Sequence, residues 1–208
     1  MIDQTETGKK NLNDSSIVPQ KGSFWNSVWL FTWDFLKILG LALAIIIPVR
    51  YYLFQPFIVT GQSMQPNFHQ GEYLIIDEIT YRLSLPRRGD VSVIHSPADP
   101  SQYFIKRIIG LPGETIEIRN GMVVVKNSEH AAGFTLVEPY LPSNIATFGN
   151  ITVTLDEDHY YVLGDNRLAS SDSRFFGPIT RESIVGRVVL RAFPLDKFTK
   201  FSAPLYQF

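Results

Sequence analysis

The sequence contains no cysteine, and its 208 residues carry a formal net charge of only -1. Without cysteine there is no disulfide, no thiolate nucleophile and no cysteine-ligated metal, although this absence decides nothing about the compartment. A charge close to zero gives no electrostatic reason to expect a nucleic-acid partner. The four histidines lack a spacing such as H-E-x-x-H, which would place two metal ligands on one helix face. We therefore expect no metal, no cofactor and no nucleic-acid partner.

A polar segment begins the chain and an apolar segment follows it. Residues 1–24 show no apolar periodicity, and we predict that they form a disordered tail. From Trp25 the chain becomes apolar and aromatic, with tryptophans at i, i+4 and i+8, as is typical of the aromatic belt at a membrane interface. We predict a membrane-anchoring helix over residues 25–54 and an exported domain over residues 55–208.

The apolar core of this anchor is short. Uninterrupted apolar residues run only over Ile38–Val49, against about 20 for a membrane span, and such a length also fits a signal-peptide core or a buried helix. Lys37 and Arg50 bracket the core and can extend their charged ends to the interface, which lengthens the usable segment to about Trp33–Phe54. No small-x-small cleavage site follows, so we favour an uncleaved, single-pass anchor.

The distribution of positive charge predicts the orientation of the anchor. After Arg50 there is no lysine or arginine until Arg82. The lysines that precede the apolar core are Lys9, Lys10, Lys21 and Lys37. Because positively charged flanks are retained in the cytoplasm, we expect a cytoplasmic tail and a domain on the extracytoplasmic side of the cell membrane, with the lipid bilayer as a partner.

Beyond the anchor, short β-prone runs are separated by glycine, proline, asparagine or aspartate. The runs cover residues 73–77, 90–95, 103–109, 151–155, 159–163 and 183–193. The clearest local signal is Asn120-Gly121 between two β-prone runs, because a two-residue type I′ hairpin requires such a pair. Residues 112–158 hold this hairpin and few catalytic-type side chains. We therefore predict a mainly β domain that carries a small β-hairpin insertion at about 112–158.

Two residues suggest chemistry. Lys106 lies within the apolar run YFIKRII, where burial would disfavour the ammonium form and lower the pKa of its amine. A neutral lysine can accept the proton of a serine hydroxyl, so a Ser-Lys pair can replace Ser-His-Asp, and Ser63 in GQSMQ is the candidate serine. Two plainer interpretations exist. Lys106 could keep its amine in water on an edge strand, and a serine beside glycine is usually a turn residue.

Four motifs in a fixed order resemble those of a known family. They are GQSMQPNF (61–68), RRGDVSVI (87–94), YFIKRIIGLPGE (103–114) and YYVLGDNRLASSDSRFFGPI (160–179). With the apolar segment before them, the chain resembles bacterial type I signal peptidase over roughly residues 54–193. The resemblance implies an antiparallel β catalytic domain related to self-cleaving repressors, a Ser-Lys dyad, and removal of signal peptides from secreted preproteins.

The resemblance also assigns roles by position. Ser63 would be the nucleophile and Lys106 the general base, while Ser170 would supply the hydroxyl that hydrogen-bonds the lysine, with Ser171 as its neighbour and alternative. The supporting ion pairs would be Asp172 with Arg174, or Asp165 with Arg107. The positions that match the family's subsites for small side chains are Phe57, Val59, Met64, Phe68, Phe104 and Ile105. Alternate residues of the strands at 57–59 and 104–106 would flank an extended substrate, although each could equally be an ordinary core residue.

The sequence departs from the family pattern at three positions. Many members carry a serine two residues before the nucleophile, where its hydroxyl helps to form the oxyanion hole, and this chain has Gly61. The Ser63 N–H remains one donor, and the second is open. Asn67 stands where threonine is common and Leu168 where a polar residue is common, but neither touches the expected proton transfer.

Geometry favours a substrate at the membrane. Ser63 follows Phe54 by nine residues, at most ~30 Å of extended chain. A signal peptide presents its small-x-small site at the outer face of the bilayer, so secretory preproteins are the expected substrates. A self-cleaving Ser-Lys regulator would share the catalytic pair, but it needs no anchor and carries its own Ala-Gly-like bond, which does not occur before Ser63. From another class, a non-catalytic, membrane-tethered β module that binds extended peptides is the alternative.

Overall fold

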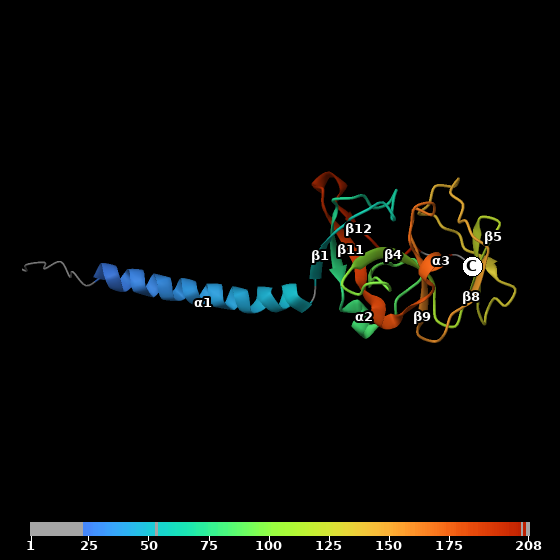
Figure 1. Cartoon of the computed structure of the whole chain (residues 1–208). Helices are drawn as coiled ribbons and strands as arrows, with labels where there is room; N and C mark the ends of the chain where they lie inside the picture. Colours follow the sequence, from blue (N-terminus) through green and yellow to red (C-terminus); the bar gives the residue numbers. More distant parts are fainter. Residues whose placement is uncertain (1–22, 53, 205, 207–208) are drawn as a thin grey trace, which may run out of the picture. The chain divides into compact units, whose positions relative to one another are not determined.

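The chain forms two compact units, Met1–Ile45 and Ile46–Phe208. The computed structural model describes residues 23–52, 54–204 and 206 (Figure 1). Most of the predicted tail, residues 1–22, therefore lies outside the described part of the chain.

Helix α1 covers Ser23–Tyr52 and contains the predicted anchor. Its segment Val28–Ile47 has 20 residues and is long and apolar enough to cross a membrane, because 1.5 Å per residue gives about 30 Å. This segment begins upstream of the predicted apolar core and includes Lys37, whose Nζ lies 3.1 Å from the Asp34 carboxylate. The helix begins before residue 25 and ends before Phe54, so the predicted bounds 25–54 are shifted by about two residues.

An eight-stranded antiparallel sheet forms the centre of the second unit. Its strands are β1 (Phe54–Ile58), β2 (Tyr73–Asp77), β3 (Val91–His95), β4 (Tyr103–Gly110), β9 (His159–Leu163), β10 (Ile179–Thr180), β11 (Ile184–Phe193) and β12 (Thr199–Lys200). The order is β1-β2-β11-β3-β4-β9-β10, with β12 also paired to β11. Among the described residues, β1 has only β2 as a partner, and β4 pairs with β9 only from Arg107 onward. One edge of β1 and one edge of the first half of β4 are therefore open.

The six predicted β-prone runs are confirmed as strands, each within one residue of its predicted bounds. They correspond to β2, β3, β4, β9 and β11 of the large sheet and to β8 of a second sheet. Short helices connect the strands. They are α2 (Thr80–Leu83), α3 (Ser173–Phe176) and the 3₁₀ turns η1 (Arg181–Ser183) and η2 (Leu195–Lys197).

The insertion is a four-stranded sheet, which is larger than the hairpin predicted for it. Its strands are β5 (Thr115–Arg119), β6 (Met122–Lys126), β7 (Phe134–Thr135) and β8 (Ile151–Thr154), in the order β7-β6-β5-β8. The hairpin itself is confirmed, because Asn120 and Gly121 have φ of 52° and 78°, as a type I′ turn requires. An isolated hairpin is marginally stable, and β7 and β8 enlarge the face that it buries.

Three apolar clusters form the core of the second unit. One joins the insertion to the large sheet through Ile116, Ile118, Val123 and Val125 packed with Ile109, Leu155, Tyr161 and Leu163. A second lies under the turn after β1, and a third packs α2 and β10 against β3, β4 and β9. Alternating burial along β5 and β11 shows the period of two expected of strands with one covered face. The second cluster supports the turn that carries Ser63.

Candidate active site

Ser63 lies in the turn between β1 and β2. Backbone hydrogen bonds close the base of this loop, from the Val59 N–H to the Glu72 carbonyl and from the Gly71 N–H to the Val59 carbonyl, both at 2.9 Å. Gly61 has a φ of +83°, a conformation that residues with a side chain rarely adopt. The glycine that replaces the family's serine therefore suits the backbone of the turn that presents Ser63.

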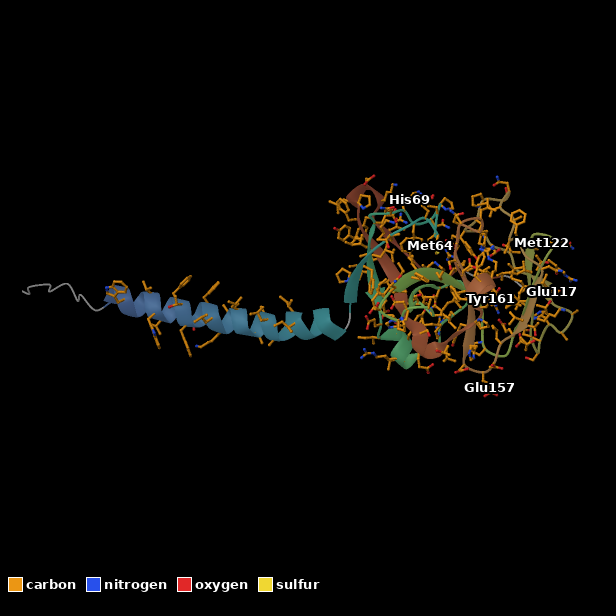
Figure 2. All side chains as sticks on the ribbon, in the orientation of Figure 1. Met64, His69, Glu117, Met122, Glu157 and Tyr161 are labelled. Atoms are coloured by element: carbon orange, nitrogen blue, oxygen red, sulfur yellow. The ribbon has the colours of Figure 1, made fainter. Side chains whose placement is uncertain are left out.

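Met64 and Phe68 anchor this turn in the core. Each is 1% exposed, and both belong to the cluster that includes Leu74 (Met64 is labelled in Figure 2). The Met64 sulfur also accepts a hydrogen bond from the Asp165 N–H at 3.5 Å. Packing of the turn buries both side chains, and neither is among the residues that line the cavity beside Ser63.

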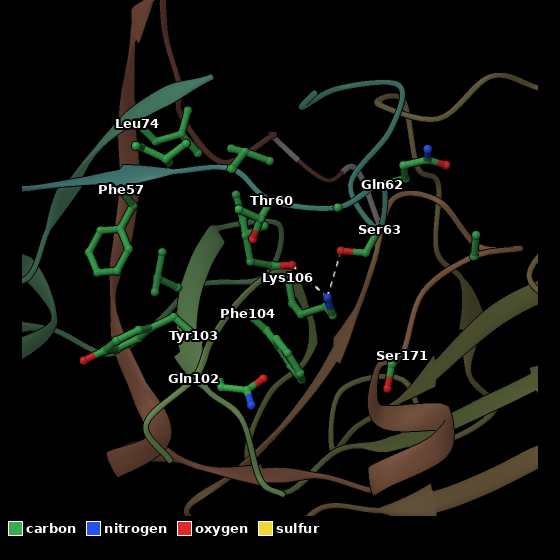
Figure 3. Close-up of a pocket in the computed structure, with 16 residues that line it drawn as sticks. Phe57, Thr60, Gln62, Ser63, Leu74, Gln102, Tyr103, Phe104, Lys106 and Ser171 are labelled. Atoms are coloured by element: carbon green, nitrogen blue, oxygen red, sulfur yellow. Dashed lines mark hydrogen bonds between the residues drawn. The ribbon is translucent and has the colours of Figure 1, made fainter. Parts of the chain in front are cut away.

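Lys106 brings its amine to Ser63 from strand β4. Its Nζ lies 3.0 Å from the Ser63 Oγ and 3.0 Å from the Ile105 carbonyl oxygen (Figure 3). The side chain is buried, with the residue 3% exposed, and the amine sits 5.1 Å from the centre of the Phe104 ring. The plainer interpretation, in which this lysine keeps its amine in water, is therefore wrong.

Burial controls the protonation of this amine. Desolvation lowers the pKa of Lys106 from 10.5 to about 8, although the negative charges of Asp172 and then Asp165 act to raise it. With a pKa of about 8, roughly a tenth of the lysine is neutral at pH 7, since each pH unit changes the ratio tenfold. In the ammonium form Nζ donates to the Ser63 Oγ, whereas the neutral amine can accept the hydroxyl proton.

Both expected arginine–aspartate pairs form, and each is bidentate. Arg107 donates to Asp165 from Nε at 2.8 Å and from Nη2 at 2.6 Å, and Arg174 donates to Asp172 from the same two atoms at 2.8 Å. The two aspartates are completely buried. Asp172 also accepts the Gly164 N–H at 3.0 Å. The pairs therefore neutralise the carboxylates near Lys106 and fix the loop between β9 and α3.

Ser170 does not make the expected hydrogen bond to Lys106. Its side chain is buried, and its Oγ has no hydrogen-bond partner among the described residues. The hydroxyl instead packs against Gly164, where an added Cβ would overlap both the Ser170 Oγ and the Ser63 carbonyl oxygen. The physical reason is packing, because the buried Ser170 side chain is directed against Gly164. Ser171, the alternative, lines the pocket, and Figure 3 marks no hydrogen bond from it to Lys106.

A cavity of about 330 Å³ opens in front of the Ser63–Lys106 pair. Four of the expected subsite residues line it: Phe57, Val59, Phe104 and Ile105. Figure 3 shows the cavity between the strand end that carries Phe57 and the strand that carries Phe104. The lining residues that sequence reasoning missed are Ile58, Thr60, Gln62, Leu74, Val93, Gln102, Tyr103 and Ala169. Gln62, Val93, Tyr103 and Ala169 lie within the recognised motifs, and Thr60 and Gln102 directly precede them, so position in or beside a motif was the available signal.

A polar network that sequence reasoning also missed surrounds the site. The Asn67 side-chain amide donates to Asp165 at 2.8 Å and to the Tyr140 carbonyl at 2.9 Å, so it links the Ser63 turn to the insertion. Arg167, whose side chain is fully buried, pairs with Glu138 of the insertion. Asn67 had been interpreted only as a departure from the family pattern, and Arg167 only as part of a motif.

The described residues contain no group of three or more His, Cys, Asp or Glu side chains placed to hold a metal ion. The buried acidic groups of the site, Asp165 and Asp172, each accept hydrogen bonds from an arginine instead. The contact between the Ser63 Oγ and the Lys106 Nζ offers proton transfer between a hydroxyl and an amine.

Comparisons with known proteins show what the chain is similar to. Residues 32–193 match the family model of signal peptidase, peptidase S26. Signal peptidase I of Leptolyngbya laminosa is 33% identical over 176 residues, which cover 81% of this chain and 83% of the relative. Signal peptidase I of Bacillus amyloliquefaciens is 35% identical over 172 residues, with 78% and 86% covered. The crystal structure of a signal peptidase I from Enterococcus faecalis V583 is 33% identical, with a TM-score of 0.43, and covers 50% of this chain and 97% of that one.

The family match identifies a serine peptidase whose β domain follows an apolar helix. The chain belongs to the signal peptidase family, peptidase S26. The resemblance found in the four ordered motifs is thereby confirmed.

Proposed function

We propose that this protein is a membrane-anchored serine endopeptidase that removes N-terminal signal peptides from secretory preproteins at small-x-small sites, with Ser63 and Lys106 as a catalytic dyad. The observation that carries the proposal is the 3.0 Å contact between the Ser63 Oγ and a buried lysine amine at the wall of an open cavity. Membership of the signal peptidase family supports the same reaction.

In the acylation step, neutral Lys106 accepts the Ser63 hydroxyl proton while Oγ bonds to the scissile carbonyl carbon. The carbonyl oxygen becomes an oxyanion, for which the Ser63 N–H is the nearby backbone donor. When the intermediate collapses, the C–N bond breaks and Lys106 returns the proton to the leaving amine. Water then attacks the acyl-enzyme carbonyl as Lys106 takes its proton. The second intermediate collapses when the bond between the Ser63 Oγ and the acyl carbon breaks and Lys106 returns the proton to Oγ, and the signal peptide leaves with a new carboxyl group.

The open edges of β1 and β4 provide a place for an extended substrate. A strand between them can hydrogen-bond to both edges, and its alternate side chains would point into the cavity lined by Phe57, Val59, Phe104 and Ile105. The cavity of about 330 Å³ gives these side chains a place to bind. The preference for small residues at both positions is part of the proposal.

The membrane location and orientation of the protein are part of the same proposal. Helix α1 holds a segment long enough to span the membrane, and β1 begins within two residues of its end. We place the tail of residues 1–24 in the cytoplasm and the catalytic domain of residues 55–208 on the extracytoplasmic side. In this arrangement the nucleophile works near the outer membrane surface, where a signal peptide exposes its cleavage site.

Cleavage by the purified protein tests the proposal. Full-length protein in detergent should cut a preprotein with an Ala-x-Ala site after the second alanine, and Ser63→Ala should abolish the cut. A substrate with leucine at both alanine positions should resist cleavage if the enzyme requires small side chains there. Binding without cleavage by the wild type would identify a non-catalytic peptide-binding module instead.

A further inference from the structure

The Ser63 N–H has to be held in one direction if it is to stabilise an oxyanion. Among the described residues no acceptor takes a hydrogen bond from it, so the donor is free for a substrate. Its direction is set by the peptide unit that joins Gln62 to Ser63, because the carbonyl of one residue and the N–H of the next lie in one plane and point oppositely. Gly61 precedes this unit and adds backbone freedom. Whatever holds the Gln62 carbonyl therefore aims the Ser63 N–H.

Asn166 holds the carbonyls on both sides of the nucleophile. Its side-chain Nδ2 donates to the Gln62 carbonyl oxygen at 3.1 Å, and its backbone N–H donates to the Ser63 carbonyl oxygen at 3.0 Å. The Gln62 oxygen also accepts the Gln65 N–H at 3.1 Å, but that bond lies within the turn itself. The bonds from Asn166 tie the turn to a loop about a hundred residues away in the chain.

Asn166 is itself fixed in place. Its Oδ1 accepts the Ala169 N–H at 3.2 Å, and because a backbone N–H can only donate, this contact directs the amide NH₂ toward Gln62. The residues on either side are buried and paired with arginine or glutamate, Asp165 with Arg107 and Arg167 with Glu138. The amide is therefore preorganised by its neighbours.

We propose that Asn166 is a positioning residue that aims the Ser63 N–H at the developing oxyanion through its hydrogen bonds to the carbonyls of Gln62 and Ser63. The inference rests on the proposed function, since it concerns the transition state of that reaction. It also gives a reason for the asparagine in GDNR, beside the two charged residues whose pairs hold the loop. Asn166 acts on the oxyanion donor and leaves the contacts of the Lys106 base unchanged.

The first test is Asn166→Ala in the full chain. We expect kcat to fall about 10- to 100-fold, less than the 10²- to 10³-fold typical of losing an oxyanion donor outright, because Gln65 still holds the Gln62 carbonyl. KM should change by no more than about two-fold, as expected for an interaction made only in the transition state. The pH of half-maximal activity should match that of the wild type. The matched control is Asn144→Ala, whose side chain is exposed, and it should retain wild-type kcat.

A second variant and an inhibitor sharpen the test. Asn166→Asp keeps an oxygen for the Ala169 N–H but removes the donor to Gln62, so its loss of kcat should be at least that of Asn166→Ala. A peptide aldehyde, which adds to the Ser63 Oγ and forms an oxyanion, should lose affinity in proportion to kcat/KM. An uncleavable peptide of the same sequence should bind both variants as it binds the wild type.

Two results would overturn the inference while the wild type remains active. One is a kcat within about two-fold of wild type in both variants, and the other is a loss that appears in KM or shifts the pH profile instead. An inactive wild type overturns the proposed function together with this inference, so the two failures are distinguishable.

Discussion

At the scale of single residues, burial of Lys106 determines the protonation state of its amine. An amine packed beside Phe104 and hydrogen-bonded to Ser63 is costly to keep charged, and this cost is what makes its neutral form accessible near physiological pH. The nearby carboxylates of Asp172 and Asp165 work against this effect, and their arginine partners limit it. The activity of the dyad should therefore follow the balance between desolvation and paired charge.

The first prediction concerns pH and Lys106. Burial lowers the pKa of Lys106 from 10.5 to about 8, so the base gains its neutral form as pH rises through about 8, and turnover should rise with it. Lys106→Arg keeps a positive charge but cannot deprotonate in this range, so it should be as inactive as Lys106→Ala. Initial rates with an Ala-x-Ala peptide across the pH range, with circular dichroism as the folding control, measure both effects. Substantial turnover by a folded arginine variant would move the base elsewhere, with His69 or His95 as the next candidates.

The second prediction concerns Gly164. An added Cβ would overlap the Ser170 Oγ and the Ser63 carbonyl oxygen, and the backbone atom cannot move without displacing the nucleophile. We expect Gly164→Ala to reduce kcat at least about 100-fold, because a displacement near 1 Å at a reacting group has this cost. Gly40→Ala is the matched control, since nothing lies within 4 Å of its added Cβ. Wild-type kinetics in Gly164→Ala would show that the Ser63 turn tolerates displacement.

Sequence reasoning at this scale found the chemical groups but not all their orientations. Ser63 and Lys106 were recognisable because a lysine in an apolar strand and an ordered set of motifs are properties of the sequence itself. Ser170 was expected beside the lysine and instead packs on Gly164. Met64 was expected in the pocket and lies in the core. The direction of a side chain in a turn depends on contacts with distant strands. The local sequence does not specify those contacts.

At the scale of elements, the loop from Gly164 to Asp172 connects the two sheets. It contacts the Ser63 turn through Asn166, the large sheet through the Asp165–Arg107 pair, and the insertion through Arg167. The Arg107 guanidinium also lies 3.8 Å from the centre of the Tyr140 ring, which belongs to the insertion. The insertion therefore supports this loop as well as the Ser63 turn, which it contacts through Asn67.

The third prediction tests this support. Arg167 has a fully buried side chain, so Glu138→Ala leaves its charge without a carboxylate and should lower the free energy of unfolding by about 3 kcal/mol. Turnover should fall as well, because the loop that holds Asn166 loses one of its attachments. Urea denaturation and peptide cleavage measure the two effects.

Two comparisons control this experiment. Replacing both members, Glu138→Leu with Arg167→Met, should recover much of the stability, since no buried charge remains unpaired. Glu117→Ala, which removes the Glu117–Lys126 pair on the same insertion, should cost far less because that lysine is partly exposed. Equal losses for Glu138→Ala and Glu117→Ala would show that burial of Arg167 contributes nothing to the stability of the loop.

The elements themselves were largely predictable. Alternation and turn residues located six strands, and Asn120-Gly121 specified a hairpin whose dihedral angles agree. The two-residue strands β7, β10 and β12 were missed because so short a segment has no measurable periodicity. The growth of the insertion into a four-stranded sheet was missed for a related reason. Phe134–Thr135 forms a strand by pairing with β6, and the loop between them carries no sequence signal that predicts this pairing.

At the scale of the whole molecule, the chain joins one apolar helix, long enough to cross a membrane, to one β domain that carries Ser63 and Lys106. The segment Val28–Ile47 contains Asp34 and Lys37 as a close pair, so its charges compensate each other. Lys37 thus lies within the candidate span and no longer counts as a flank. The predicted orientation then rests on Lys9, Lys10 and Lys21 on one side against Arg50 on the other, a difference that still favours a cytoplasmic N-terminus.

The fourth prediction is the topology of the full chain in a living membrane, and the absence of cysteine makes it directly measurable. Single cysteines at Ser15→Cys, before the span, and at Ser128→Cys, an exposed position of the insertion, leave each variant with one thiol. In spheroplasts a membrane-impermeant maleimide should label Ser128→Cys at once and Ser15→Cys only after lysis, because three lysines hold the tail in the cytoplasm. Protease added from outside should likewise digest the β domain. Labelling of Ser15→Cys in intact spheroplasts, with Ser128→Cys protected, would place the Ser63–Lys106 pair in the cytoplasm, away from the outer face at which a signal peptide presents its cleavage site.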